Sequence, residues 1–254
     1  MNEITEHTLH TLELHTVLGL LADCAVSEEA KEQCRKLQPD TDADEVRRAQ
    51  EETEAARHLI VIKGTPGFQD VKDVAPSLSR ADRGGTLGTL ELLRIAGVLR
   101  TARSIKEYAE SDEKCVLDGW FSALSTNRYL EDRIRNSILS EEEIADSASA
   151  ELADIRRHMR AQSAKIRDSL QKIVSSPSYA KYLRDPIVTL RADRYVVPVK
   201  SEFKNEIPGL VHDVSSSGNT FFIEPMSAVN ANNALRELLT REKREIERIL
   251  AELS

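Results

Sequence analysis

Apolar residues recur at helical spacing along most of the chain. Apolar positions follow this spacing in residues 9–21, 46–60 and 86–109, and each of these segments predicts a helix. A further helix is expected to begin near Ser27 and to end before Pro39, and Asp40 or Asp42 is placed to cap the next one. Residues 1–125 are therefore predicted to form a helical core.

The longest periodic stretch begins at Ile144 and meets no glycine or proline before Pro177. Its apolar positions are Ile144, Ala148, Leu152, Ile155, Met159, Ile166, Leu170 and Ile173. They predict a helix of about 33 residues and about 50 Å. Such a length is typical of a spacer or a coiled-coil arm. Residues 126–175 are expected to be outgoing lever helices.

The pattern then changes to short β-branched runs. DPIVTLRADRYVVPVK predicts a β-hairpin, and the missing N–H of Pro198 favours an edge position for its second strand. GLVHDV and TFFIEP predict a second strand pair around SSSGN. Residues 176–228 are thus expected to form a β clamp. Helical spacing returns at 229–254, a returning lever helix whose pattern is unbroken at Ser254, as expected of a fragment cut inside a helix.

The predicted fold class is mainly α with a small β module. A helical core would carry two long lever helices with a β-hairpin clamp between them. The two levers are expected to pack antiparallel, because each has an apolar stripe that needs burial against a partner.

Composition agrees with a helix-rich protein and excludes several classes. The 254 residues are 31% charged and 4% aromatic. No apolar run approaches the roughly 18 residues of a membrane span, and no secretory signal pattern is present. The three cysteines lack metal-ligand spacing, and their odd number argues against a disulfide framework. A cytoplasmic protein without a membrane partner is expected.

Charge is distributed unevenly. The net charge of −8 argues against nucleic acid as a partner when taken alone. Residues 1–60, however, hold 14 acidic and 6 basic residues, whereas residues 151–204 hold 12 basic and 6 acidic residues. A basic segment dominates binding locally even when the whole chain is acidic. The basic face between Arg156 and Lys172 is more often a solvated helix surface than a binding site.

The stretch GLVHDVSSSGNTFFIEP suggests three kinds of chemistry. A hydrolytic triad is disfavoured, because His212 and Asp213 are neighbours in a strand and point to opposite faces. No Gly-x-Ser-x-Gly elbow and no Walker A motif is present. A metal site built from His212, Asp213 and Glu224 is equally weak. No catalytic residue and no metal ligand are predicted.

The remaining alternatives are an ordinary hairpin turn and a phosphate-binding turn, and the residues leave both open. Ser-Gly-Asn is common turn chemistry, while consecutive amides and hydroxyls also bind anions. Basic residues of the same module would neutralise phosphates, and its aromatic residues would either stack on bases or fill a small core. The candidate nucleic-acid-binding residues are Arg191, Arg194, Lys200, Lys204, Ser215, Ser216, Ser217 and Asn219.

These residues resemble a known family. RADRYVVPVK followed by GLVHDVSSSGNTFFIEP is similar to the signature of the second bacterial MutS branch, the Smr-bearing MutS paralogues. LELHTVLGLLADCAVSEEAKEQCRKLQP, EETEAARHLI and DVAPSLSRADRGGTLGTLELLRIAGVLRTAR match its N-terminal pattern. The resemblance implies a core, lever and clamp region. It also implies that a MutS-type ATPase using ATP and Mg²⁺, and an Smr nuclease, belong to a longer protein and are absent here.

Three functions follow from this resemblance. The first is a fragment, itself without enzymatic activity, that grips the phosphate backbone of branched DNA in recombination control. The second is a clamp that binds ribosomal RNA and protein in the rescue of collided ribosomes. The third is a structural arm for dimerisation, since the full-length family is expected to be homodimeric.

Overall fold

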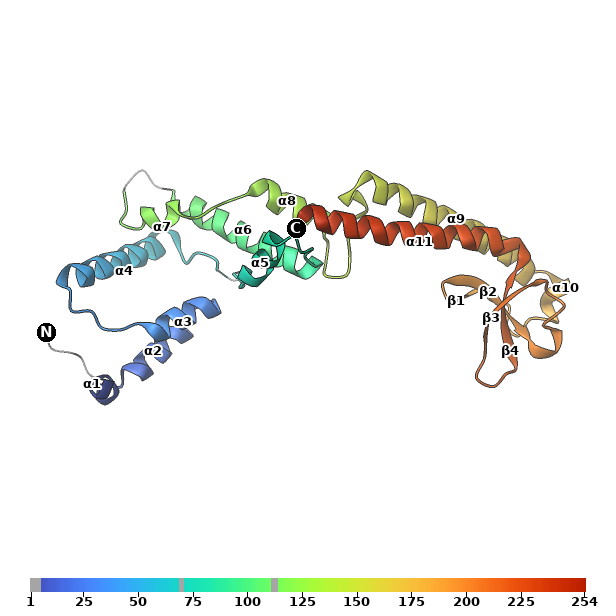
Figure 1. The fold of residues 1–254 in the computed structure, drawn as a ribbon, viewed down its shortest axis with the longest axis horizontal. Helices are drawn as coiled ribbons and strands as arrows, with labels where there is room; N and C mark the ends of the chain where they lie inside the picture. The colour runs from blue at the N-terminus through green and yellow to red at the C-terminus, as the bar shows by residue number, and fades with distance from the viewer. Residues whose placement is uncertain (1–5, 69–70, 111–113) are drawn as a thin grey trace. The chain divides into compact units, whose positions relative to one another are not determined.

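The computed structural model describes residues 6–68, 71–110 and 114–254. Within them the chain is mainly helical with one four-stranded antiparallel sheet, which confirms the predicted fold class (Figure 1). The chain divides into two compact units. Unit 1 comprises residues 1–144 and 250–254, and unit 2 comprises residues 145–249.

Unit 1 is built from short and medium helices. They are α1 (Glu6–Thr11), α2 (Leu14–Asp23), α3 (Glu28–Lys36), α4 (Ala43–Lys63), α5 (Ala75–Asp82), α6 (Thr89–Ala109), α7 (Asp118–Ser122) and α8 (Arg128–Ser137). The predicted helix start near Ser27 and the predicted cap at Asp42 are confirmed. Ser27 Oγ accepts from Ala30 N at 3.1 Å, and Asp42 Oδ1 accepts from Asp44 N at 2.8 Å. Glu13, with φ of 53°, separates α1 from α2, where the apolar spacing alone predicts one helix.

A buried ion pair ties α6 to α8 within unit 1. Arg103 donates to both carboxylate oxygens of Glu131 at 3.0 Å, and the Glu131 side chain is 4% exposed. The apolar core beside it includes Leu92 and Ile134, both buried. The chain's last residues also belong to this unit, since Leu87 N donates to Ser254 Oγ at 2.8 Å.

Unit 2 begins with η1 (Asp146–Ala148) and α9 (Ala150–Val174), and ends in α11 (Met226–Leu253). The predicted helix of about 33 residues is wrong in length, because α9 has 25 residues. Ser149 is its N-cap and accepts from Leu152 N at 2.9 Å. Ile144 instead forms a β-bridge with Ile138. Ile144 is buried, so it is apolar and fits the helical spacing even though the backbone there is not helical.

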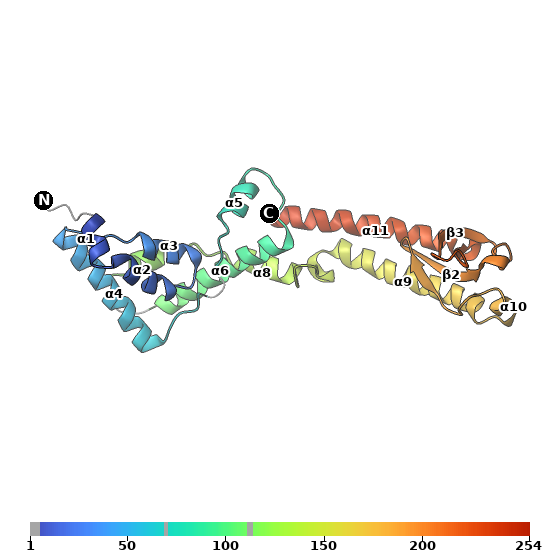
Figure 2. The ribbon, with the colours of Figure 1, turned by 90° about the horizontal axis from the view of Figure 1, so that it is seen from below.

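Helices α9 and α11 lie side by side and run antiparallel (Figure 1, Figure 2). Near the start of α9, Glu151 accepts from Arg241 at 2.6 Å and Arg156 donates to Glu242 at 2.7 Å. Near the end of α9, the apolar Leu170 shares a core cluster with Leu235 of α11. The predicted antiparallel pair is thus confirmed, with polar contacts at one end of the seam and apolar packing at the other.

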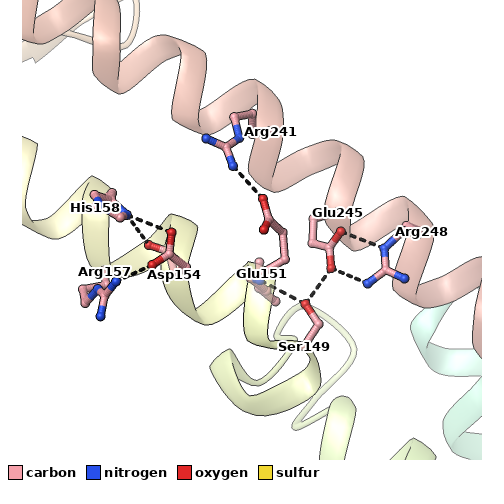
Figure 3. Close-up of polar contacts among 9 residues, drawn as sticks. Ser149, Glu151, Asp154, Arg157, His158, Arg241, Glu245 and Arg248 are labelled. Carbon is pink, nitrogen blue, oxygen red and sulfur yellow. Dashed lines mark hydrogen bonds and ion pairs between the residues drawn. The ribbon is translucent and has the colours of Figure 1, made fainter.

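Figure 3 shows the polar end of this seam. Glu245 of α11 is buried and accepts from Ser149 Oγ at 2.6 Å and from Arg248 Nη2 at 2.7 Å. Hydrogen bonds from Arg248 lower the pKa of Glu245 from 4.5 to about 2, assisted by Ser149 and opposed by burial. Because the folded pKa lies below the unfolded one, the stabilising effect is complete above the unfolded pKa. It is lost as pH falls towards about 2.

Glu245→Gln is expected to lower the free energy of unfolding by about 1–2 kcal/mol at neutral pH, allowing for solvent around the half-exposed Arg248. The parent should lose that difference as the pH falls from about 5 to about 2. Chemical denaturation across this range measures it. The exposed Glu247→Gln on the same helix is the control. An equal pH dependence in parent and Glu245→Gln would contradict the prediction.

The sheet of unit 2 contains β1 (Thr189–Arg191), β2 (Arg194–Lys200), β3 (Gly209–Val214) and β4 (Thr220–Pro225), in the order β1-β2-β4-β3. Both predicted strand pairs are confirmed. Helix α10 (Pro177–Ala180) precedes β1, and η2 (Ser201–Phe203) follows β2. Residues 177–225 are called the β module below.

The predicted edge position of β2 is wrong, because β2 lies between β1 and β4. Pro198 O accepts from Arg184 N at 2.9 Å, so the backbone of Pro198 faces away from β4. The N–H and C=O of a strand residue point to the same side. The absent N–H of Pro198 therefore lies beyond the end of β1 and removes no bond to β4.

One face of the sheet packs on α9 and α11. Its core cluster contains Ile166, Leu170, Val174, Leu183, Val197, Val199, Ile207, Ile223, Ala228 and Leu235. Phe221 packs against this cluster and is partly buried. Filling of a small core, the simpler of the two explanations for the aromatic residues, therefore accounts for Phe221.

Candidate nucleic-acid interface

The turn between β3 and β4, Ser215–Asn219, is called the serine turn. Gly218 N donates to Ser215 O at 2.8 Å, and Gly218 has φ of +72°, which favours glycine. Ser215 Oγ accepts from Thr220 N at 3.1 Å, so this hydroxyl closes the turn. Ser216, Ser217 and Asn219 are exposed. Turn chemistry thus accounts for Ser215 and Gly218, and phosphate binding by the exposed residues stays a prediction.

Different roles for these serines predict different stabilities. Ser215→Ala is expected to cost about 0.5–1.5 kcal/mol, because it removes the acceptor of the Thr220 amide. Ser216→Ala with Ser217→Ala should stay within about 0.5 kcal/mol of the parent, because both residues are exposed. Chemical denaturation measures both. Equal losses in the two variants would show that the turn is not closed by Ser215.

Three lysines of the β module are called the lysine cluster: Lys181, Lys200 and Lys204. Lys200 pairs with Thr220 across the strands, and its Nζ donates to Lys181 O at 3.0 Å. The neighbouring Ser201 N donates to Asn219 O at 3.1 Å and joins this end of β2 to the turn. The structure therefore brings Lys200, Lys204 and the turn together, as the sequence-based site requires.

Aromatic rings hold two of these lysines in place. Lys204 Nζ lies 5.5 Å from the centre of the Phe221 ring, and Lys181 Nζ lies 4.7 Å from that of Tyr182. Such cation–π contacts restrict the side chains but leave the ammonium groups accessible to a ligand. Lys181 is not among the binding residues predicted from the sequence. The signal in the sequence for Lys181 is the aromatic residue that follows it, Tyr182. The ring centre of Tyr182 lies 5.3 Å from that of Phe203, which directly precedes Lys204 in the chain.

Arg191 lies at the end of β1, opposite Arg194. Its guanidinium carbon is 4.4 Å from the centre of the Phe222 ring, and its Nε is 3.4 Å from Asp213 Oδ2. The side chain is 43% exposed. Arg191 therefore remains accessible, but Asp213 offsets part of its charge.

Arg194 occupies a different environment from the lysines. It lies at the other end of β2 from Lys200, and its side chain is only 13% exposed. Its Nη1 donates to both oxygens of the fully buried Glu224 at 2.8 Å, and its Nη2 donates to Asn233 at 2.7 Å. These bonds occupy the guanidinium inside the protein. Binding of nucleic acid by Arg194 stays a prediction that has to compete with them.

Curated relatives place this chain among known proteins. Endonuclease MutS2 of Acetivibrio thermocellus is 48% identical over 256 residues, which cover 99% of the chain and 32% of that relative. Endonuclease MutS2 of Ruminiclostridium cellulolyticum is 45% identical over 255 residues, and that of Clostridioides difficile is 43% identical over 256. The chain is a MutS2-like segment. No protein-family model matches it.

The MutS2-like chain spans about a third of the length of the curated relatives it matches. The match nevertheless covers the β module, both long helices and unit 1, because 99% of the chain is aligned. Among the described residues, none of the helices is both long enough and apolar enough to cross a membrane.

The basic face of α9 is largely used within this MutS2-like chain. Arg156 bonds Asp146 and Glu242 at 2.7 Å, and Arg160 bonds Asp146 at 3.0 Å. Arg157 pairs with Asp154 on the same helix (Figure 3). The arginines near the start of α9 thus contact acidic residues of unit 2. Lys165 and Lys172, further along α9, are exposed.

Proposed function

We propose that the β module of this MutS2-like chain binds the sugar–phosphate backbone of nucleic acid, with branched DNA in recombination control as its substrate. The observation that carries the proposal is the meeting of the lysine cluster and the serine turn at one end of the sheet. Lysine ammonium groups neutralise phosphates, and hydroxyl and amide groups supply further donors. The MutS2 relatives support a nucleic-acid-related role.

Recognition through the backbone fits the residues better than recognition of bases. Lysines act as flexible point charges, whereas base reading uses bidentate side chains such as arginine on guanine. The exposed Glu202 and Glu206 lie in the same segment and limit the local positive charge. We therefore expect few phosphate contacts, with DNA shape deciding the preferred substrate.

The test compares binding of the chain to a four-way DNA junction, to linear duplex of the same length and to ribosomes, each across a salt series. Preferential binding to the junction, with affinity that falls steeply with salt, supports the proposal. Affinity for ribosomes without affinity for either DNA would replace it with the ribosomal alternative. Concentration-dependent dimerisation without nucleic-acid binding would instead support the third alternative, a structural arm for dimerisation.

ATP hydrolysis with Mg²⁺ and nuclease chemistry are proposed to belong to the part of the MutS2 relatives that this chain does not cover. The chain itself would bind the nucleic acid through the β module, which the long helices carry. Nuclease activity that purifies with the chain and disappears on a point substitution within it would contradict this division of labour.

A further inference from the structure

We infer that Asn232 and Glu224 are positioning residues, which fix the direction in which the β module leaves α11. Both residues are fully buried, and the phosphate contacts proposed above use neither. Asn232 Nδ2 donates to Glu224 Oε1 at 2.8 Å. The two side chains thus connect the last strand of the sheet to the second turn of α11.

Asn232 also acts as a strand-like partner for β2. Its Oδ1 accepts from Tyr195 N at 3.1 Å, and its Nδ2 donates to Tyr195 O at 3.1 Å. A side-chain amide has an acceptor oxygen and two N–H donors, so Asn232 can pair with both backbone groups of Tyr195 and still donate to Glu224. Asn232 therefore satisfies both backbone groups of Tyr195 and attaches β2 to the helix.

Glu224 gathers the other strands at the same point. Arg194 of β2 donates to both of its oxygens, and His212 Nε2 of β3 lies 2.5 Å from Oε2. His212 occupies the bulge where the register shifts between Val211 and Asp213. Glu224, Arg194, His212 and Asn232 are together called the polar joint. The joint contacts β2, β3, β4 and α11.

The polar joint supplies what apolar packing cannot. The apolar residues of α11 in the shared core are Ala228, Ala231 and Leu235, whose contacts are non-directional. Hydrogen bonds depend on angle as well as distance. β4 ends at Pro225 and α11 begins at Met226, so the two elements are joined by one peptide bond. Without the polar joint, only this connection and the apolar packing would set the angle between the sheet and α11. The joint therefore fixes the angle at which the lysine cluster is presented.

The consequence for binding rests on the proposed function, whereas the geometric consequence does not. A joint that loses Asn232 leaves every lysine of the cluster in place. We expect Asn232→Leu to weaken nucleic-acid binding roughly threefold to tenfold through lost preorganisation, with an unchanged salt slope. Loss of a phosphate contact would instead lower the slope.

The decisive experiment measures a distance. In the full chain, with Cys24, Cys34 and Cys115 replaced by serine, spin labels are attached at Ser216→Cys in the turn and Lys243→Cys on α11. Double electron–electron resonance then gives the distribution of distances. We expect Asn232→Leu to broaden it relative to the parent, and the exposed Asn230→Leu on the same helix to leave it unchanged. Circular dichroism and amide exchange of Val197, Val199 and Lys200 check that the sheet is intact.

A second variant keeps the test valid if Asn232→Leu fails to fold. Arg194→Lys retains a cation beside Glu224 but cannot bridge Glu224 and Asn233 at once. It should also broaden the distribution. Distributions that match the parent in the folded variants would overturn the inference. An absence of nucleic-acid binding in the parent would overturn the proposed function alone, because the distances are measured without nucleic acid.

Discussion

Ile155→Asp is expected to destabilise unit 2 by about 3–5 kcal/mol, the range for an unpaired charge placed in an apolar core. Ile155 is 1% exposed and lies in α9. A carboxylate at this position would lose its hydration, because the Ile155 side chain is buried. Ile246→Asp on α11 should cost less, about 1–2 kcal/mol, because Ile246 is only half-buried and its side chain still reaches solvent.

Chemical denaturation followed by circular dichroism measures both variants. Ile155→Val is the matched control, since it removes one methylene group without adding charge and should cost about 0.5–1.5 kcal/mol. The expected order is therefore Ile155→Asp, then Ile246→Asp, with Ile155→Val closest to the parent. A loss in Ile155→Asp no larger than in Ile155→Val would show that α9 does not bury this position in solution.

Local signals in the sequence explain why much of the fold was predictable. Ser27 and Asp42 cap helices through bonds to amides two or three residues away, so their neighbours suffice to identify them. Both hairpins have a turn between β-branched runs, and the strands lie next to each other in the chain. The start of α9 was missed because the buried Ile144 keeps the apolar spacing, and burial alone does not distinguish a helix from a β-bridge.

The central position of β2 depended on a partner distant in sequence. Pro198 lacks a donor, and local chemistry therefore favours an edge strand. The missing donor is tolerated because its side of the strand faces the segment of Leu183 and Arg184, which precedes β1. Only the three-dimensional arrangement reveals that this segment is there.

The candidate site also combines features that local sequence predicts with features that only the fold shows. Sequence identifies charges, but it does not show which of them are already paired. Arg194 and Glu224 are 30 residues apart, so nothing local marked Arg194 as part of an internal ion pair. Arg194→Ala would leave the buried Glu224 carboxylate without its main partner. A binding loss in that variant would therefore confuse folding with recognition, and the lysines offer the cleaner test.

Removal of the three charges of the lysine cluster is expected to abolish most nucleic-acid binding. Lys181→Gln, Lys200→Gln and Lys204→Gln keep much of each aliphatic stem while removing the ammonium groups. Each phosphate contact contributes about 0.9 to the slope of log affinity against log salt concentration. Loss of all three should lower the slope by about 2 to 3 units. At about 0.1 M salt, affinity should then fall by about two to three orders of magnitude.

A control with the same change in net charge separates local contacts from long-range attraction. Lys165, Lys172 and Lys243 are exposed on α9 and α11, and their replacement by glutamine also removes three positive charges. This variant should bind within about threefold of the parent, because the proposed phosphate contacts use none of these three lysines. Equal losses in the two triple variants would move the phosphate contacts from the β module to the long helices. Unchanged binding in the cluster variant, with the sheet intact by circular dichroism, would remove the β module from recognition.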